Sequence, residues 1–148
     1  MRRALLVACL AACAADDAPA PDFPRDYAAT FVEVRDCRRS GDHDLHFIRI
    51  LADPVGLAAY RDRTAFPAGA IVVKEEYDFT DGACAGAILQ WTSMVKLAEP
   101  GDDTVRTWHW QRVDAARTVV EEDTPRCLGC HAQCGGPPDG HDGTCATP

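Results

Sequence analysis

Apolar and polar positions in the middle of the chain alternate in a way that predicts an antiparallel β-sheet. Three segments are rich in branched and aromatic residues, and only short turns containing Asp-Gly or Pro-Gly-Asp separate them. Connections of this length allow hairpins but no crossover, so the three strands are expected to form a meander. The expected strands are residues 71–77, 87–97 and 105–113, preceded by a buried strand at 45–51.

Helical spacing and capping signals predict short helices around this sheet. Apolar residues recur at helical spacing from Tyr27 to Val34, which indicates a first helix ending before residue 40. Asp53-Pro54 is typical of a helix start and predicts a helix to about residue 62. A third helix is expected after Thr124-Pro125, followed by an irregular Gly/Pro-rich tail. The predicted fold class is α+β, with four to five antiparallel strands and two to three short helices.

Alternation within the strands decides which side chains share a face. Lys74 shares its face with Val72 and Glu76. A lysine near a strand end can also simply reach water beside neighbouring glutamates, and that structural interpretation stays open. Trp108 and Trp110 share one face of the last strand. This aromatic face can pack against a flat cofactor, although ordinary core packing explains the two rings equally well.

The segment Cys127-Leu128-Gly129-Cys130-His131 has the spacing typical of a c-type haem attachment site. On a helical turn, positions i, i+3 and i+4 share one face, so two thiols can add to the haem vinyl groups while the imidazole binds iron. We therefore expect one covalent haem c, held by Cys127 and Cys130, with His131 as the iron ligand. A thioredoxin-like dithiol and a zinc site remain alternatives. The zinc site would add one of Cys134, His141 and Cys145.

The position of the motif argues against the small electron-transfer cytochromes, which usually carry it near the N-terminus with an axial methionine downstream. Only 17 residues follow His131, and none is methionine. A sixth iron ligand would have to come from upstream, or the iron would stay open on one side and bind small molecules. The upstream candidates are Met94, Lys74, Lys96, His43, His46 and His109.

The first residues are typical of an exported protein. Two arginines and a short apolar run predict a signal peptide over residues 1–12. The run ends in Leu10-Ala11-Ala12-Cys13, which resembles the lipobox of bacterial lipoproteins and implies lipidation of Cys13; ordinary cleavage nearby would leave a soluble periplasmic protein. Residues 13–24 predict a flexible tether, and residues 25–148 a single domain. The expected location is the periplasm or the outer membrane.

Acidic residues outnumber basic ones, which removes two classes of partner. The formal net charge is −8, and loss of residues 1–12 lowers the basic residues from 15 to 13 against 23 acidic ones, which gives −10. Such a surface is unsuited to nucleic acid and to electrostatic attachment to anionic lipid. Any membrane attachment would therefore depend on acyl chains.

Four segments together resemble the cytochrome P-460 and cytochrome c′-beta family. They are Phe66–Glu75 (FPAGAIVVKE), Trp91–Lys96 (WTSMVK), Trp108-His109-Trp110 and Cys127–His131. The resemblance covers roughly residues 27–131. It implies a mostly antiparallel β fold, often dimeric, with one haem whose iron is open or weakly ligated on its distal side.

The resemblance also implies roles for individual residues. Lys74 matches the lysine that is covalently linked to the macrocycle in the branch that oxidises hydroxylamine. The branch without this link has aromatic residues on the distal side and binds nitric oxide. Arg49 is the candidate for a distal-pocket arginine, and Phe47 and Phe66 are candidates for the aromatic role.

Hydroxylamine oxidation would also need a proton acceptor and an electron acceptor. Glu76 is the first candidate for the base because it shares a strand face with Lys74, and Glu75 is the second. Both glutamates are equally compatible with an ordinary solvated charged pair. Electrons would leave through a partner cytochrome.

The chain departs from the family pattern in four additional cysteines, which allow three disulfide pairings. We expect Cys37–Cys84 across the domain and Cys134–Cys145 across the tail. The sequence is therefore compatible with three function classes. They are a haem protein with an iron open to small nitrogen species, an electron-transfer cytochrome lipoprotein without catalysis, and a zinc or disulfide module.

Overall fold

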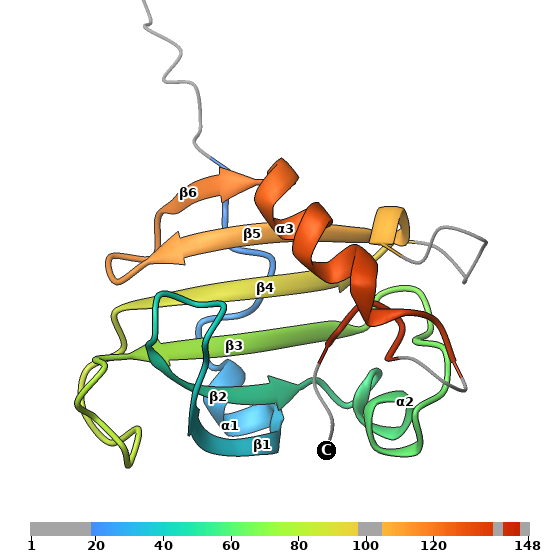
Figure 1. Cartoon of the computed structure of the whole chain (residues 1–148). Helices are drawn as coiled ribbons and strands as arrows, with labels where there is room; N and C mark the ends of the chain where they lie inside the picture. Colours follow the sequence, from blue (N-terminus) through green and yellow to red (C-terminus); the bar gives the residue numbers. More distant parts are fainter. Residues whose placement is uncertain (1–18, 98–104, 138–140, 146–148) are drawn as a thin grey trace, which may run out of the picture.

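A computed structural model describes residues 19–97, 105–137 and 141–145 (Figure 1). The predicted signal peptide, the predicted lipidation site Cys13 and the first part of the predicted tether lie outside these residues. No helix in the described ranges is long and apolar enough to cross a membrane. The described residues include the whole Cys127–His131 motif.

Six antiparallel strands form one sheet in which every strand pairs with its neighbour in sequence (Figure 1). The predicted α+β class is confirmed, and the sheet has one or two strands more than expected. The three-stranded meander predicted in its centre is present as β3, β4 and β5. The strands are β1 (Val32–Arg39), β2 (Phe47–Ala52), β3 (Ile71–Tyr77), β4 (Gln90–Lys96), β5 (Trp108–Asp114) and β6 (Val119–Glu122).

Three short helices lie on the two faces of the sheet. Helix α1 (Tyr27–Thr30) lies behind the sheet in Figure 1, whereas α3 (Pro125–His131) crosses in front of it. Helix α2 (Leu57–Asp62) contributes Ala59 and Tyr60 to the same apolar cluster against which α3 packs. The 3₁₀ turns are η1 (Val105–Thr107) and η2 (Ala132–Cys134). The haem motif is therefore carried on a helix above one sheet face, with Pro125 in its first turn as expected.

The predicted first helix is wrong beyond Thr30. Residues 32–39 form β1, which pairs with β2 from Val32 opposite Ala52 to Arg39 opposite Phe47. The helical spacing of three apolar residues was coincidental. The ladder to β2 overrode it because it pairs backbone groups along most of the segment, with irregularities between Glu33 and Arg35 and between Arg35 and Arg38. β6 was missed because it is only four residues long and ends in two glutamates.

Asp53 has a different role from the predicted helix cap. Its Oδ1 accepts hydrogen bonds from the backbone N–H groups of Gly56 (2.8 Å) and Ile71 (3.0 Å). The side chain therefore closes a turn and ties it to the start of β3, and α2 begins only at Leu57. The predicted strands 87–97 and 105–113 also start later, at Gln90 and Trp108.

Alternate residues of the strands form two separate cores. The core on the α2 and α3 side is built from aliphatic residues of β2 to β4 and from Phe66, Trp108 and Trp110. The core on the α1 side includes Phe23, Trp91 and Val113. Phe23 is 2% exposed, so packing begins slightly before the domain boundary placed near Pro24.

Two disulfides connect segments that the sheet does not pair. Cys37 of β1 is bonded to Cys84 in the β3–β4 loop, and Cys134 is bonded to Cys145 in the C-terminal segment. These are the two pairings expected from the sequence. Cys127 and Cys130 carry free thiols.

Candidate functional site

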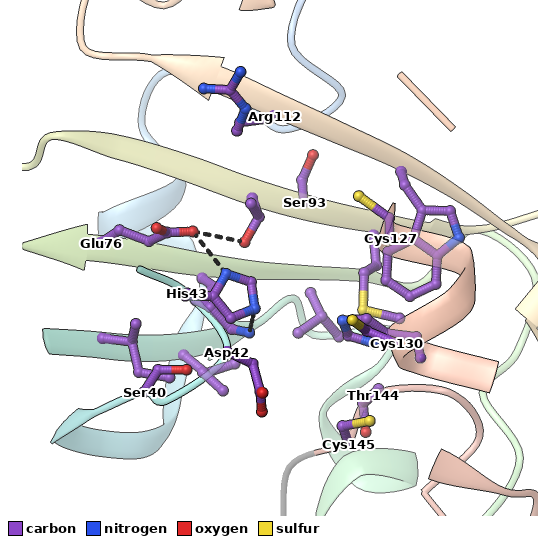
Figure 2. Close-up of a pocket in the computed structure, with 18 of the residues that line it drawn as sticks. Ser40, Asp42, His43, Glu76, Ser93, Arg112, Cys127, Cys130, Thr144 and Cys145 are labelled. Carbon is purple, nitrogen blue, oxygen red and sulfur yellow. Dashed lines mark hydrogen bonds and ion pairs between the residues drawn. The ribbon is translucent and has the colours of Figure 1, made fainter. Parts of the chain in front are cut away.

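A cavity of about 580 Å³ lies between the sheet, α3 and the β1–β2 loop. Lys74, Glu76, Met94 and Trp110 line it from the sheet. Cys127, Cys130 and His131 line it from α3. In Figure 2, Glu76 and His43 point toward each other on one side, and the two cysteines project from α3 on the other. The alternation predicted for β3 therefore places Lys74 and Glu76 on the face that carries the cavity.

His131 is held in a definite orientation beside the cavity. Its Nδ1 lies 2.5 Å from the backbone carbonyl of Gly143, and its ring centroid lies 4.3 Å from that of Trp110. Burial lowers the pKa of His131 to about 4, so the imidazole is neutral at neutral pH. A neutral imidazole whose Nδ1–H donates to a carbonyl leaves Nε2 as the atom that can bind a metal.

The zinc interpretation does not suit the observed sulfur chemistry. The zinc site considered from the sequence combined Cys127, Cys130 and His131 with one of Cys134, His141 and Cys145. In the described residues, the group whose ligand atoms lie within 4.8 Å of one another is instead His131, Cys134 and Cys145. However, the two sulfur atoms are joined to each other in a disulfide. Zinc binds thiolates, and a disulfide offers none. The free thiols are instead the two of the haem motif, with Thr124 Oγ1 3.3 Å from Cys127 Sγ.

Unsatisfied polar atoms in the cavity wall indicate a ligand with polar groups of its own. Within the described residues, five buried side-chain nitrogen or oxygen atoms have no hydrogen-bond partner, and four belong to residues that line the cavity. These four are Arg38 Nε, Tyr60 Oη, Ser93 Oγ and Trp110 Nε1. Buried polar groups are normally paired, so their clustering needs a partner inside the cavity.

The residues around the cavity fit a c-type haem. Apolar side chains of β2, β3 and β4 line the cavity and can pack against the macrocycle, and the free thiols of Cys127 and Cys130 suit its two vinyl groups. Arg35 and Arg38 of β1 bring two guanidinium groups to the cavity, and burial, followed by Arg38, lowers the pKa of Arg35. Neighbouring cations beside the unpaired Tyr60 hydroxyl are suited to the two propionate groups of a haem.

A second group of polar residues lies on the cavity side of β3. Nζ of Lys74 is 2.7 Å from Nε2 of His43, and Nδ1 of His43 is 3.1 Å from Oε1 of Glu76 (Figure 2). Oε2 of Glu76 lies 2.9 Å from Nδ1 of His46 and 2.8 Å from Nε2 of Gln90. Lys74, His43 and Glu76 thus form a continuous hydrogen-bonded chain, which we call the Lys74–His43–Glu76 chain.

Burial and pairing shift the titration of both ends of this chain. Burial lowers the pKa of Lys74 to about 8, with Glu76 opposing the shift. Burial disfavours the charged form of Glu76, but hydrogen bonds and charge from His43, with Gln90 and His46, outweigh burial and lower its pKa to about 2. At neutral pH Glu76 is therefore an ionised carboxylate that can accept a hydrogen bond, and a fraction of Lys74 is neutral.

The structure separates the six candidates for a sixth iron ligand. Lys74, His43 and Met94 line the cavity. Lys96 is instead paired with Asp142, and His109 lies on the other face, 2.8 Å from Asp123. His46 is held at 2.9 Å by Glu76.

Arg49 and Glu75 lie on the sheet face opposite the cavity. Arg49 Nε donates to Glu75 Oε2 at 2.7 Å, and Tyr27 and Tyr77 each donate to Glu75 at 2.6 Å. Neither residue lines the cavity, because the register of β2 against β3 places Arg49 opposite Glu75. Phe47 and Phe66 also lie outside the cavity lining; Phe66 packs on Trp108 instead. The sites of Arg49 and both phenylalanines thus differ from those that the resemblance implied.

Sequence reasoning missed the roles of several cavity residues. The sequence pattern indicates His43 only as a candidate iron ligand and indicates no role for Arg35, Arg38 and Tyr60. Their signal was hidden because β1 was predicted as a helix, which obscured the β1–β2 hairpin that brings His43 to Glu76. The sequence GDHDLH between two strands could have indicated a hairpin loop carrying two histidines.

A haem-attachment helix above an antiparallel sheet, with an adjoining cavity that fits the macrocycle, defines a c-type haem protein. The family model of cytochrome P460 matches residues 24–136. This range covers well over half of the 148 residues, and the chain belongs to the cytochrome P460 family. Comparison with curated proteins gives no match.

Proposed function

We propose that the protein is a periplasmic, lipid-anchored monohaem c-type cytochrome whose iron is open to small nitrogen species. Its activity would be the oxidation of hydroxylamine or the binding of nitric oxide. The observation that carries the proposal is the Lys74–His43–Glu76 chain in the wall of the cavity that also holds the free thiols and His131. An electron carrier with a filled coordination sphere has no need of such a chain.

Individual residues would hold the haem in defined ways. Cys127 and Cys130 would form the two thioether bonds, and Nε2 of His131 would bind the iron. Arg35 and Arg38 would face the propionate groups. When bound, the haem would supply a metal that binds small nitrogen ligands and passes their electrons on.

The Lys74–His43–Glu76 chain would move protons away from a bound substrate. Oε1 of Glu76 would accept a hydrogen bond from Nδ1–H of His43 and orient the ring, so that Nε2 of His43 could take a proton from the cavity side. The low pKa of Glu76 keeps the carboxylate ionised, so it remains a hydrogen-bond acceptor for His43. Electrons would leave to a partner cytochrome, since the described residues contain no second haem motif.

Lys74 decides between the two activities. Its side chain reaches into the cavity, and its lowered pKa leaves part of it as a neutral amine, which suits covalent attachment to a macrocycle. Proteolytic digestion followed by mass spectrometry should give a haem peptide that contains both the Cys127–His131 segment and Lys74. The reduced protein should also have a strongly red-shifted Soret band. A free Lys74 would exclude the haem-linked form that oxidises hydroxylamine. Nitric oxide binding would then be the remaining one of the two activities.

Electron transfer without catalysis is the second candidate function. Met94 lines the cavity, and a thioether is a common sixth ligand in electron-transfer cytochromes. Addition of carbon monoxide to the reduced protein separates the candidates. An open iron should bind the gas at once, whereas a spectrum that does not change would establish the electron-transfer function.

The anchor and the assembly belong to the same proposal. Lipidation at Cys13 would hold the protein at the periplasmic side of a membrane, and a homodimer would agree with the family. The intact mass of mature protein should equal residues 13–148 plus one haem and acyl chains. A Cys13→Ser variant should lose the acyl mass and appear in the soluble fraction.

A further inference from the structure

Lys96 and Asp142 form an ion pair that is completely removed from solvent. Nζ of Lys96 lies 3.0 Å from Oδ1 and 2.8 Å from Oδ2 of Asp142, and both side chains are 0% exposed. Lys96 also donates to Oγ1 of Thr107 at 2.8 Å. Burying two charges costs desolvation energy that often cancels their attraction, so stability alone is a weak reason for such a pair. Its position therefore needs another explanation.

Asp142 fastens the C-terminal segment 141–145 to β4, to β5 and to the connection between α2 and β3. Besides the bond to Lys96 of β4, its Oδ2 accepts the backbone N–H of Phe66 at 2.9 Å. Its backbone carbonyl accepts Nε1–H of Trp108 at 2.8 Å. The Cys134–Cys145 disulfide ties the end of the same segment to the turn that follows α3. The segment is thus held from two sides.

The residue after Asp142 makes the contact that matters for the haem. Gly143 has a φ of +82°, a left-handed conformation that favours glycine, and its carbonyl lies 2.5 Å from Nδ1 of His131. A hydrogen bond from the second ring nitrogen of a metal-bound histidine fixes the ring and makes the ligating nitrogen a stronger donor. The placement of one carbonyl therefore controls the ligand strength of His131.

We infer that Lys96 and Asp142, together with the Cys134–Cys145 disulfide, position the Gly143 carbonyl and thereby set the strength of the bond between His131 and the iron. The inference rests on haem attachment at Cys127–His131 but not on which nitrogen species reacts. Lys96 and Asp142 are positioning residues, since neither lines the cavity. The expected consequence is an electron-rich imidazole that would keep its bond to the iron when the metal binds a strong ligand such as nitric oxide.

A purely structural ion pair would weaken the fold without altering His131, and the chain contains a matched control. Glu75 is 1% exposed and binds Arg49 at 2.7 Å on the opposite face of the sheet, away from α3. Glu75→Gln removes one buried carboxylate charge, as Asp142→Asn does. Loss of stability should follow both substitutions, but only the second should alter the histidine ligand.

The experiment uses full-length haem-loaded protein in the reduced state. Asp142→Asn should move the iron–histidine stretching band in the resonance Raman spectrum to lower frequency. It should also speed the displacement of His131 by excess nitric oxide by about tenfold, whereas Glu75→Gln should change neither. If Asp142→Asn fails to fold, the Gly143→Ala and the Cys134→Ser/Cys145→Ser proteins provide the same two readouts.

An unchanged band and displacement rate in the folded variants would overturn the inference. So would equal changes in Glu75→Gln. Both measurements are independent of hydroxylamine turnover, so absence of that activity would refute the proposed oxidation and leave this inference standing.

Discussion

Nε2 of His43 lies 2.7 Å from Nζ of Lys74, although the two residues come from a loop and a strand that are 31 positions apart. The same imidazole reaches Glu76 through Nδ1, so His43 connects a buried amine to a buried carboxylate. His46, on the same loop, also contacts Glu76 through Nδ1, at 2.9 Å. Both loop histidines therefore contact Glu76. Among the hydrogen bonds of the described residues, His43 alone of the two also contacts Lys74.

Substitution of His43 should impair proton transfer. In protein that oxidises hydroxylamine, His43→Asn should lower kcat about 100-fold, because a positioned base contributes at least that much to a proton transfer. His46→Asn is the matched control, since it removes one bond to Glu76 and leaves the contact with Lys74. Steady-state reduction of an electron-accepting dye measures the rates. Equal losses in the two variants would show that the histidines only stabilise Glu76.

The unpaired hydroxyl of Tyr60 should acquire a partner when haem is attached. Tyr60→Phe is expected to lower the free energy of unfolding of the haem-loaded protein by about 1 kcal/mol, the usual value of one hydrogen bond. The same change should cost nothing in Cys127→Ala/Cys130→Ala protein, which cannot attach haem. Tyr77→Phe is the control, because the hydroxyl of Tyr77 already donates to Glu75 at 2.6 Å. Urea unfolding measures all three, and a loss from Tyr60→Phe in the haem-free protein would contradict the prediction.

His109 should make stability depend on pH. Burial disfavours its imidazolium, but the carboxylates of Asp123, Asp22 and Glu122 outweigh burial and raise its pKa above the ordinary 6.5. A raised folded pKa stabilises the folded protein below the unfolded pKa, and this contribution is lost as the pH rises through the folded pKa. His109→Gln should therefore remove a decline in the free energy of unfolding that begins near pH 6.5. Urea titrations from pH 5.5 to 8.5 test this, and parallel curves for the two proteins would contradict it.

The two disulfides should contribute differently to stability and to the haem site. Cys37 and Cys84 are 47 positions apart, so their loss should cost about 4 kcal/mol of unfolding free energy by the chain-entropy estimate. Cys134 and Cys145 are 11 positions apart, and their loss should cost about 3 kcal/mol. Paired serine substitutions and denaturant unfolding measure both. Only the second pair should also alter the haem spectrum; a change confined to the first pair would contradict the expected division of roles.

The central sheet and the haem motif were predictable because their signals are local. Alternation along 71–77 gave β3 its correct bounds and placed Lys74 with Glu76. The spacing of Cys127–His131 gave the attachment helix. In each case the residues that determine the element lie within one short stretch of the sequence.

The remainder of the site depends on contacts between distant segments. Arg49 could be placed on a strand, but only the register with β3 shows that it pairs with Glu75 away from the cavity. The hydrogen bond between His131 and Gly143 depends on a loop that Asp142 anchors to Lys96, 46 positions earlier. Local propensity contains no information about such pairings, and β1 shows that it can also mislead when a neighbouring strand competes.

The sequential order of the six strands has a consequence for how the chain acquires its native state. Because each strand pairs with its immediate predecessor, the sheet can grow without waiting for distant partners, a topology that favours rapid folding. Other contacts join residues that are far apart in the sequence, such as the hydrogen bond from the Phe66 N–H to Asp142 across 76 positions. The attachment helix follows the last strand, so its two thiols come after all six strands in the sequence. Haem attachment would therefore involve a segment that lies beyond the whole sheet along the chain.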